Sequence, residues 1–157
     1  MKPRAPPPLK EEPFRFVAVH KSVLDFMREF MSYTHVQKWC ALSDDLLEGD
    51  EEIIRMTLRR LDTETLRDGL LEVGPKRRRG GSPRLFILRD KSGCFFLLAA
   101  MEKSNHGVKG MDTAVDRAKT VRSMTSRPNT SDNTWSDTYV LLSKGESLEK
   151  RISEPLA

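Results

Sequence analysis

The amino-acid sequence predicts an α+β fold, in which an N-terminal strand and helices precede an antiparallel β-meander and a closing helix, with flexible tails at both ends. In the first half, apolar residues recur every three or four positions, which is the spacing of amphipathic helices. In the second half, two apolar runs flank the turn sequence Asp90–Gly93, which is typical of a hairpin. A chain of 157 residues supports one domain plus tails. We therefore expect a disordered tail at 1–13, a domain at 14–124, and a linker with a C-terminal tail at 125–157.

The first elements follow from local composition. Residues 1–13 are rich in Pro, Lys and Glu, so they are expected to be extended or disordered. Residues 14–19 have the β-branched and aromatic content of a strand. Ser22 is then expected to cap a helix, with Asp25 completing a weak capping box.

Two further helical patterns, at 36–47 and 53–61, are separated by Gly49 and Asp50, which favour a break. Trp39 lies on the apolar face of the first of these helices. Core packing is therefore expected for this side chain rather than stacking on a base.

Three strands are predicted next, at 70–73, 84–89 and 94–101, because these runs are apolar and bounded by turn residues. A helix follows Gly110, and its small and apolar residues share one face that suits packing on a sheet: Met111, Ala114, Val115, Ala118 and Val121.

The C-terminal part has the composition of a linker beyond Thr125. One short helix is predicted to hold Tyr139–Leu142. Trp135 is expected either to pin this tail onto the domain or to face a partner.

Composition excludes several classes of protein. No apolar run approaches the roughly 18 residues that a membrane span needs, so no membrane association is expected. The first residues lack the apolar segment of a signal peptide. Cys40 and Cys94 have no second metal ligand nearby in sequence, so we expect buried free thiols, no metal and no cofactor. Cysteines of this kind favour the reducing cytoplasm.

The positive charge is concentrated in one part of the chain. Residues 66–124 carry thirteen Lys and Arg against six Asp and Glu, whereas residues 21–65 carry six against ten. A basic module attracts polyanions even when the whole chain has a net charge of only +4. Scattered lysines that serve solubility are the alternative.

Three candidate residues are predicted near one end of the sheet. Arg84 begins a strand, and Lys103 and His106 follow the next strand. A guanidinium, an ammonium and an imidazole suit a phosphodiester substrate. For Arg84 the alternative is a surface ion pair with Asp90 or Glu72, and for His106 it is a plain surface histidine.

The basic run is predicted to contact a polyanion, because adjacent cations repel unless something neutralises them; its residues are Lys76, Arg77, Arg78 and Arg79. A solvated loop is the alternative. Arg89 and Lys109 are added to the candidate RNA-binding set. His20 and His35 lie at the edges of elements and are expected to be structural.

The order of elements and the segments Leu-Arg-Asp-Gly-Leu-Leu-Glu-Val, Pro-Arg-Leu-Phe-Ile, Phe-Leu-Leu-Ala-Ala-Met-Glu-Lys and Ala-Val-Asp-Arg-Ala resemble the RelE/HigB toxin superfamily, particularly its phage-derived branch. The similarity covers about 14–124 and is best over 66–122. The resemblance implies a RelE-like fold and a toxin of a toxin–antitoxin module, which cleaves messenger RNA on the ribosome without metal. It also implies a helix-turn-helix antitoxin as the partner.

The resemblance further implies roles for single residues. Arg84 matches the arginine that stabilises charge on the scissile phosphate, Lys103 matches the basic residue after the last strand, and His106 falls where some members place a general acid or base. The chain departs from the family because its closing helix has no tyrosine or second histidine. His106 is therefore either the sole proton-transfer group or shares that role with Tyr139.

The leading hypothesis is thus a ribosome-associated messenger RNA endoribonuclease that blocks translation in the cytoplasm. Two alternatives remain: a non-enzymatic toxin of the same fold that inhibits DNA gyrase, and an inactive module that only binds a partner or RNA.

Overall fold

The computed structural model describes residues 15–66, 69–74, 83–90, 94–102, 108–124, 135 and 137–154. Its elements in chain order are β1 (Phe16–His20), α1 (Lys21–Glu29), α2 (Thr34–Glu48), α3 (Glu51–Arg60), β2 (Asp62–Thr65), β3 (Leu70–Gly74), β4 (Pro83–Arg89), β5 (Phe95–Glu102), α4 (Val108–Ser123), β6 (Tyr139–Ser143) and α6 (Leu148–Ser153). The fold is α+β, as the sequence predicts. Among the described helices, none has the length and apolar character that crossing a bilayer requires.

One six-stranded sheet in the described part of the chain has the order β2-β3-β4-β5-β1-β6. Neighbouring strands are antiparallel except β1 and β5, which are parallel. The predicted meander of β3, β4 and β5 is confirmed, and β2 extends it by one strand. The sequence did not predict β2, because its four residues Asp-Thr-Glu-Thr contain no apolar alternation.

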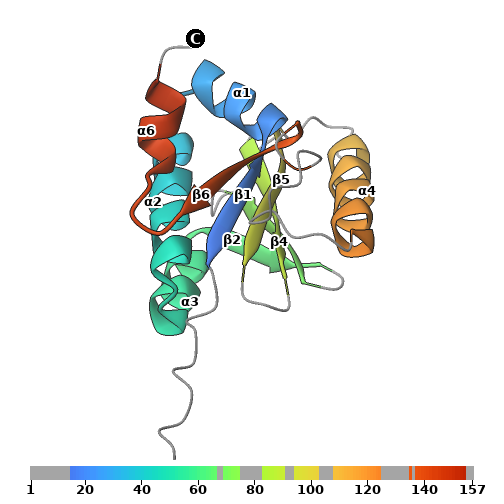
Figure 1. The fold of residues 1–157 in the computed structure, drawn as a ribbon, viewed down its shortest axis with the longest axis horizontal. Coiled ribbons are helices and arrows are strands. Elements are labelled where there is room, and N and C mark those ends of the chain that lie inside the picture. The colour runs from blue at the N-terminus through green and yellow to red at the C-terminus, as the bar shows by residue number, and fades with distance from the viewer. Residues whose placement is uncertain are drawn as a thin grey trace, which may run out of the picture.

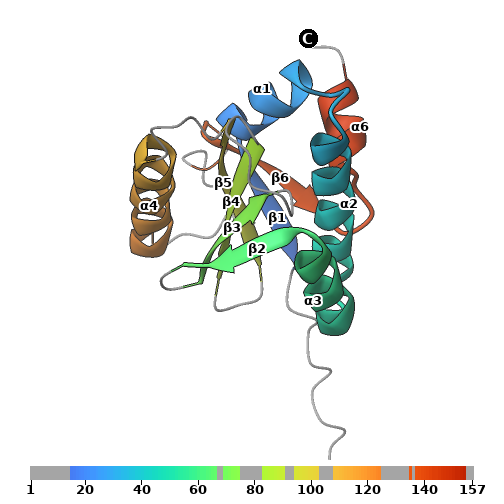
Figure 2. The same cartoon turned by 180° about the vertical axis from the view of Figure 1, so that it is seen from behind.

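The sheet lies between two unequal helical layers (Figures 1 and 2). Helices α1, α2, α3 and α6 cover one face, where they share a core with side chains such as Val17, Leu85 and Leu97. On the other face, α4 and Trp135 pack over a second core that contains Phe86, Phe96 and Leu98. Alternate residues of β4 and β5 therefore point into different cores, as the two-residue period of a strand requires.

The N-terminal elements differ slightly from the sequence prediction. Helix α1 begins one residue before Ser22, and its cap is His20, whose Nδ1 accepts a hydrogen bond from the backbone N–H of Ser22 at 3.1 Å. The predicted cap at Ser22 is therefore wrong. The predicted break between α2 and α3 is confirmed, since Gly49 ends α2 with a left-handed φ of 76° and the Asp50 carboxylate caps α3.

The C-terminal part corrects a second prediction. Residues 139–142 form β6, which pairs with β1, rather than the predicted short helix. Leu142, and Leu148 and Ile152 beyond it, are buried in the core, so this segment belongs to the domain and is not a flexible tail. Trp135 is 4% exposed and packs against Phe96 and Tyr139, which confirms that it pins the segment onto the domain. The predicted N-terminal tail lies outside the described residues.

The side chains that the sequence places in the core are buried, as predicted. Trp39 is buried on α2, and Cys40 and Cys94 are buried free thiols. Burial raises the pKa of Cys40 to about 12, so this thiol stays protonated and unreactive at neutral pH. On α4, the small residues Ala114 and Ala118 are buried against the sheet, as their spacing predicts.

Candidate functional site

Strand pairing gathers several strand ends at one end of the sheet. Pro83 at the start of β4 pairs with Glu102 at the end of β5, and His20 at the end of β1 pairs with Tyr139 at the start of β6. Because β1 runs parallel to β5, the last residues of these two strands lie toward the same end. We call this end, which also contains Gly74 of β3, the His20 end.

The two parallel strands also define a topological switch point. Helix α1 leaves β1 onto one face of the sheet, whereas the chain that leaves β5 leads to α4 on the opposite face (Figures 1 and 2). In open α/β sheets of parallel strands, ligands bind at such points, outside the carboxyl ends of the strands. In this mostly antiparallel sheet, the described strands β1 and β5 form such a pair, and their carboxyl ends lie toward the His20 end.

A polar cluster of His20, Ser22 and Arg117 lies at this switch point. The Ser22 Oγ is 2.7 Å from Nδ1 of His20, and Nη1 of Arg117 donates to the same Oγ at 3.0 Å. The same nitrogen of Arg117 also donates to the carbonyl of Leu98 on β5 at 2.7 Å. Arg117 thus ties α4 to β5 and to the first turn of α1.

The hydrogen bonds fix the protonation state of His20. The backbone N–H of Ser22 donates to Nδ1 of His20, so Nδ1 carries no proton. The imidazole proton of the neutral ring is therefore assigned to Nε2, and the Ser22 hydroxyl, which accepts from Arg117, can donate to Nδ1. Burial, which is the larger cause, and the nearby Arg117 charge together lower the pKa of His20 to about 4.

Tyr139 lies against the other side of this cluster. Its ring meets that of His20 edge to face, with centroids 5.2 Å apart. Burial raises the pKa of Tyr139 to about 12, although the nearby Arg117 opposes this shift. The phenol is therefore neutral at pH 7 and almost fully buried, which makes it a packing partner of His20.

The cluster can polarise the Ser22 hydroxyl, because a donor and an acceptor flank it as they flank nucleophilic hydroxyls. An imidazole with a pKa near 4 is, however, a weak base at pH 7. His20 also accepts from a backbone N–H as a helix cap. These features favour a rigid corner that fixes the spacing of α1, β5 and α4, and they support the structural role expected for His20.

Because the pKa of His20 is lower in the folded chain than in the free side chain, the stability of the fold should depend on pH. The folded chain holds the pKa of His20 near 4, against 6.5 for the free side chain, so the unfolded state binds the proton more readily between these values. We expect the free energy of unfolding to fall as the pH is lowered from about 6.5 to about 4. His20→Asn keeps a capping acceptor but does not titrate, so its stability should lack this component. Urea titrations of both proteins across this range test it, and a difference between them that stays constant with pH would contradict it.

The prediction that Arg84 lies at the surface is wrong. Its side chain is 3% exposed and forms an ion pair with Glu72, with Nε and Oε1 3.3 Å apart. Nη1 makes only a long contact of 3.5 Å to the carbonyl of Pro83, and Nη2 has no hydrogen-bond partner in the described part of the chain. A side chain on Gly74 would collide with this guanidinium, so the glycine provides the space that the arginine fills.

The other predicted residues divide into three groups. Lys103, His106 and the run Lys76–Arg79 lie outside the described residues. Lys109 falls in α4, but the position of its side chain is not described. Arg89 lies at the opposite end of β4 from Arg84, where it pairs with Glu51 and lies 5.5 Å from the Phe95 ring centroid.

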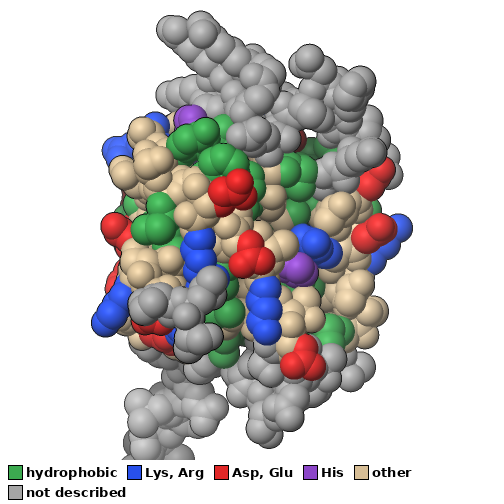
Figure 3. Space-filling model, turned by 90° about the horizontal axis from the view of Figure 1, so that it is seen from above, with side chains coloured by type: hydrophobic (Ala, Val, Ile, Leu, Met, Phe, Trp, Pro, Cys, Tyr) green, Lys and Arg blue, Asp and Glu red, His purple; other side chains and the backbone are tan. Residues whose placement is uncertain are grey.

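On the side of the molecule where α1 lies, the described side chains include both positive and negative charges. Figure 3 shows Lys and Arg side chains interspersed with Asp and Glu side chains, without a continuous basic patch among the described residues.

Sequence reasoning missed Ser22 and Arg117 as members of one cluster. Their separation of 95 positions gives no local signal, and the parallel pairing of β1 with β5 is what brings them together. Among the described residues, no group of three or more potential metal ligands lies close together. Comparison of the chain with protein families, curated proteins and solved structures finds no match.

Proposed function

We propose that the chain binds RNA at the His20 end and acts as a toxin of a toxin–antitoxin module, by cleaving messenger RNA and so blocking translation. One observation carries this proposal. Gly74 and Pro83, which flank the first candidate segment, and Glu102, which precedes the second, all lie at the His20 end.

The sequence of these two segments supplies the charge that the proposal needs. The run Lys76–Arg79 lies between β3 and β4, and Lys103 and His106 lie between β5 and α4. Pro83 and Glu102 are paired neighbours, so one end of each segment starts at adjacent positions. A polyanion that contacts one segment is therefore within reach of the other.

The proposed reaction is an attack of the RNA 2′-hydroxyl on the adjacent 3′-phosphate. It needs a base for the hydroxyl, cations for the phosphate oxygens and an acid for the leaving 5′-oxygen. His106 is proposed for proton transfer, because an ordinary imidazole titrates near pH 6.5. Lys103 is proposed for the phosphate charge. Because Arg84 is buried in its pair with Glu72, we assign it to holding the sheet end instead of to the phosphate.

The burial of Arg84 also favours one alternative, in which the same surface binds RNA or a partner without cleaving it. Removing an arginine from the catalytic set leaves Lys103 and His106 as the candidates for chemistry. Tyr139 does not replace it, since its phenol is buried beneath His20 and has a raised pKa. The two functions share a binding surface and differ in whether RNA is cut.

The binding surface is tested by the salt dependence of RNA affinity. Replacing Lys76, Arg77, Arg78 and Arg79 by Ala should weaken RNA binding and reduce the slope of log affinity against log salt by roughly 2.8–3.6, because each of four phosphate contacts contributes about 0.7–0.9. Fluorescence anisotropy with a labelled RNA at several salt concentrations measures this slope.

The matched control replaces Arg55, Arg59 and Arg60 of α3, which are exposed on a helix away from the His20 end. This variant should keep the slope of the original chain. An unchanged slope in the Lys76–Arg79 variant would reduce that run to a solvated loop and remove the main support for RNA binding.

A further inference from the structure

The described elements cover only part of the sheet face that carries α4. Six strands about 4.8 Å apart span roughly 24 Å between their outer axes, whereas one helix with its side chains is about 10–12 Å wide. Helix α4 packs on β5 and β4, and Trp135 packs over Phe96 of β5. The side of this face toward β2 and β3 therefore has no described helix over it.

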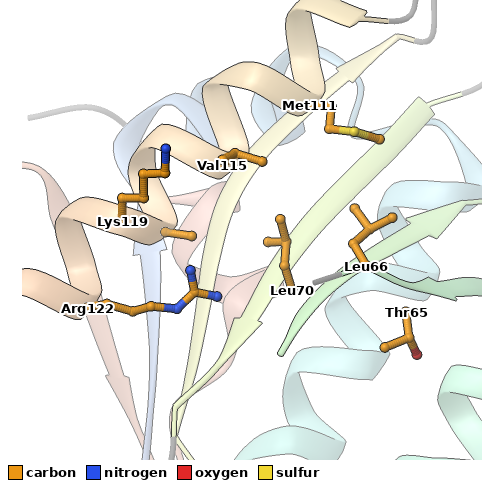
Figure 4. Close-up of a pocket in the computed structure, with 8 residues that line it drawn as sticks. Thr65, Leu66, Leu70, Met111, Val115, Lys119 and Arg122 are labelled. Carbon is orange, nitrogen blue, oxygen red and sulfur yellow. The ribbon is translucent and has the colours of Figure 1, made fainter. Parts of the chain in front are cut away.

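A cavity of about 760 Å³ lies in this region, between α4 and the β2–β3 edge of the sheet (Figure 4). Leu66 and Leu70 form its floor on the strand side, and Met111 and Val115 face them from α4. Met111 is 38% exposed, which is high for a large apolar side chain. The volume is within the range of about 300–1,000 Å³ that is usual for small-molecule sites.

Two cations complete the lining. Lys119 and Arg122 lie on the same side of α4, one and two turns beyond Val115, and Figure 4 shows the guanidinium of Arg122 extending from α4 toward the strands. None of the described residues that line the cavity is acidic. The site thus combines apolar walls with positive charge at one end.

We propose that this cavity binds an anionic amphiphile, namely an apolar chain that carries one carboxylate or phosphate. The chain lies between Leu66, Leu70, Met111 and Val115, and the head group contacts Arg122 and Lys119. Apolar contact drives the binding, and the cations select the charge of the head. This site is separate from the His20 end and does not depend on the proposed RNA function.

Decanoate, below its micellar concentration, is the probe. Titration followed by methyl NMR should shift the signals of Leu66, Leu70, Met111 and Val115. Decanol should bind about fivefold more weakly, which is the effect of losing one partly exposed ion pair, and decyltrimethylammonium more weakly still. Equal affinity for the anionic and the cationic probe, or no shift of these methyl signals, would overturn the proposal.

Two pairs of variants identify the site. Val115→Trp fills the cavity and should abolish decanoate binding, whereas Met56→Trp on the exposed face of α3 should not. Arg122→Gln leaves the cavity open, so it serves even if Val115→Trp fails to fold. It should weaken decanoate about fivefold and leave decanol unchanged, while Arg59→Gln changes neither. Unchanged decanoate affinity in Arg122→Gln would contradict the assigned head-group contact.

An experiment with vesicles distinguishes a free amphiphile from a membrane lipid as the ligand. Sedimentation with phosphatidylglycerol vesicles measures binding to the same chemistry presented by a membrane. Binding of decanoate without binding of vesicles assigns the site to a free amphiphile. Vesicle binding that Arg122→Gln weakens assigns it to a lipid.

Discussion

Replacing Arg84 by Met is expected to lower the free energy of unfolding by about 3–5 kcal/mol, because it leaves the buried carboxylate of Glu72 without its partner. Glu72→Leu should be destabilising for the same reason, since it strands the guanidinium. Urea denaturation followed by circular dichroism measures both changes.

The double variant Arg84→Met with Glu72→Leu separates structure from chemistry. It replaces both charges by apolar side chains of similar size, so most of the lost stability should return. Because we assign Arg84 to the sheet end and not to the substrate, this double variant should also remain toxic. A double variant that folds stably but is not toxic would show that Arg84 contacts the substrate, and would contradict our assignment.

The largest effect on activity is expected at His106. Loss of a general acid or base commonly lowers a rate by about 10²–10⁴-fold, so His106→Ala should abolish toxicity in cells. Lys103→Ala should cost about a hundredfold or more if its ammonium stabilises charge in the transition state. Cleavage of messenger RNA by the purified variants on ribosomes measures both losses.

Matched controls are available on α2. His35→Gln removes a half-buried imidazole, and Lys38→Ala removes an exposed ammonium. Neither should change toxicity. If His106→Ala is fully toxic and its circular dichroism is unchanged, the proton-transfer assignment is wrong.

The local elements of the fold were largely predictable. The periodicity of the helices, the hairpin around Asp90–Gly93 and the helical break at Gly49 depend on neighbouring residues, which the sequence displays directly. β6 was mistaken for a helix because Tyr139–Leu142 is a short apolar run, and such runs do not distinguish strand from helix. Its pairing with β1, which is distant in sequence, decided the outcome.

The candidate site was predictable only in outline. Charge distribution indicated which segments are basic, and strand order placed the start of both at one end of the sheet. Burial could not be predicted, because a strand-opening arginine gives the same sequence signal whether it faces solvent or fills the space above Gly74. The Ser22–Arg117 contact depends on the parallel pairing of β1 and β5, which no local pattern contains.

The central claim is that this chain blocks translation by acting on RNA, and pulse labelling after induction of the chain alone tests it most directly. Methionine incorporation should fall within minutes while thymidine incorporation continues, and new 5′ ends should appear in messenger RNA at the same time. If thymidine incorporation falls first, the chain acts on DNA replication as a gyrase inhibitor would, and the RNA proposal is contradicted.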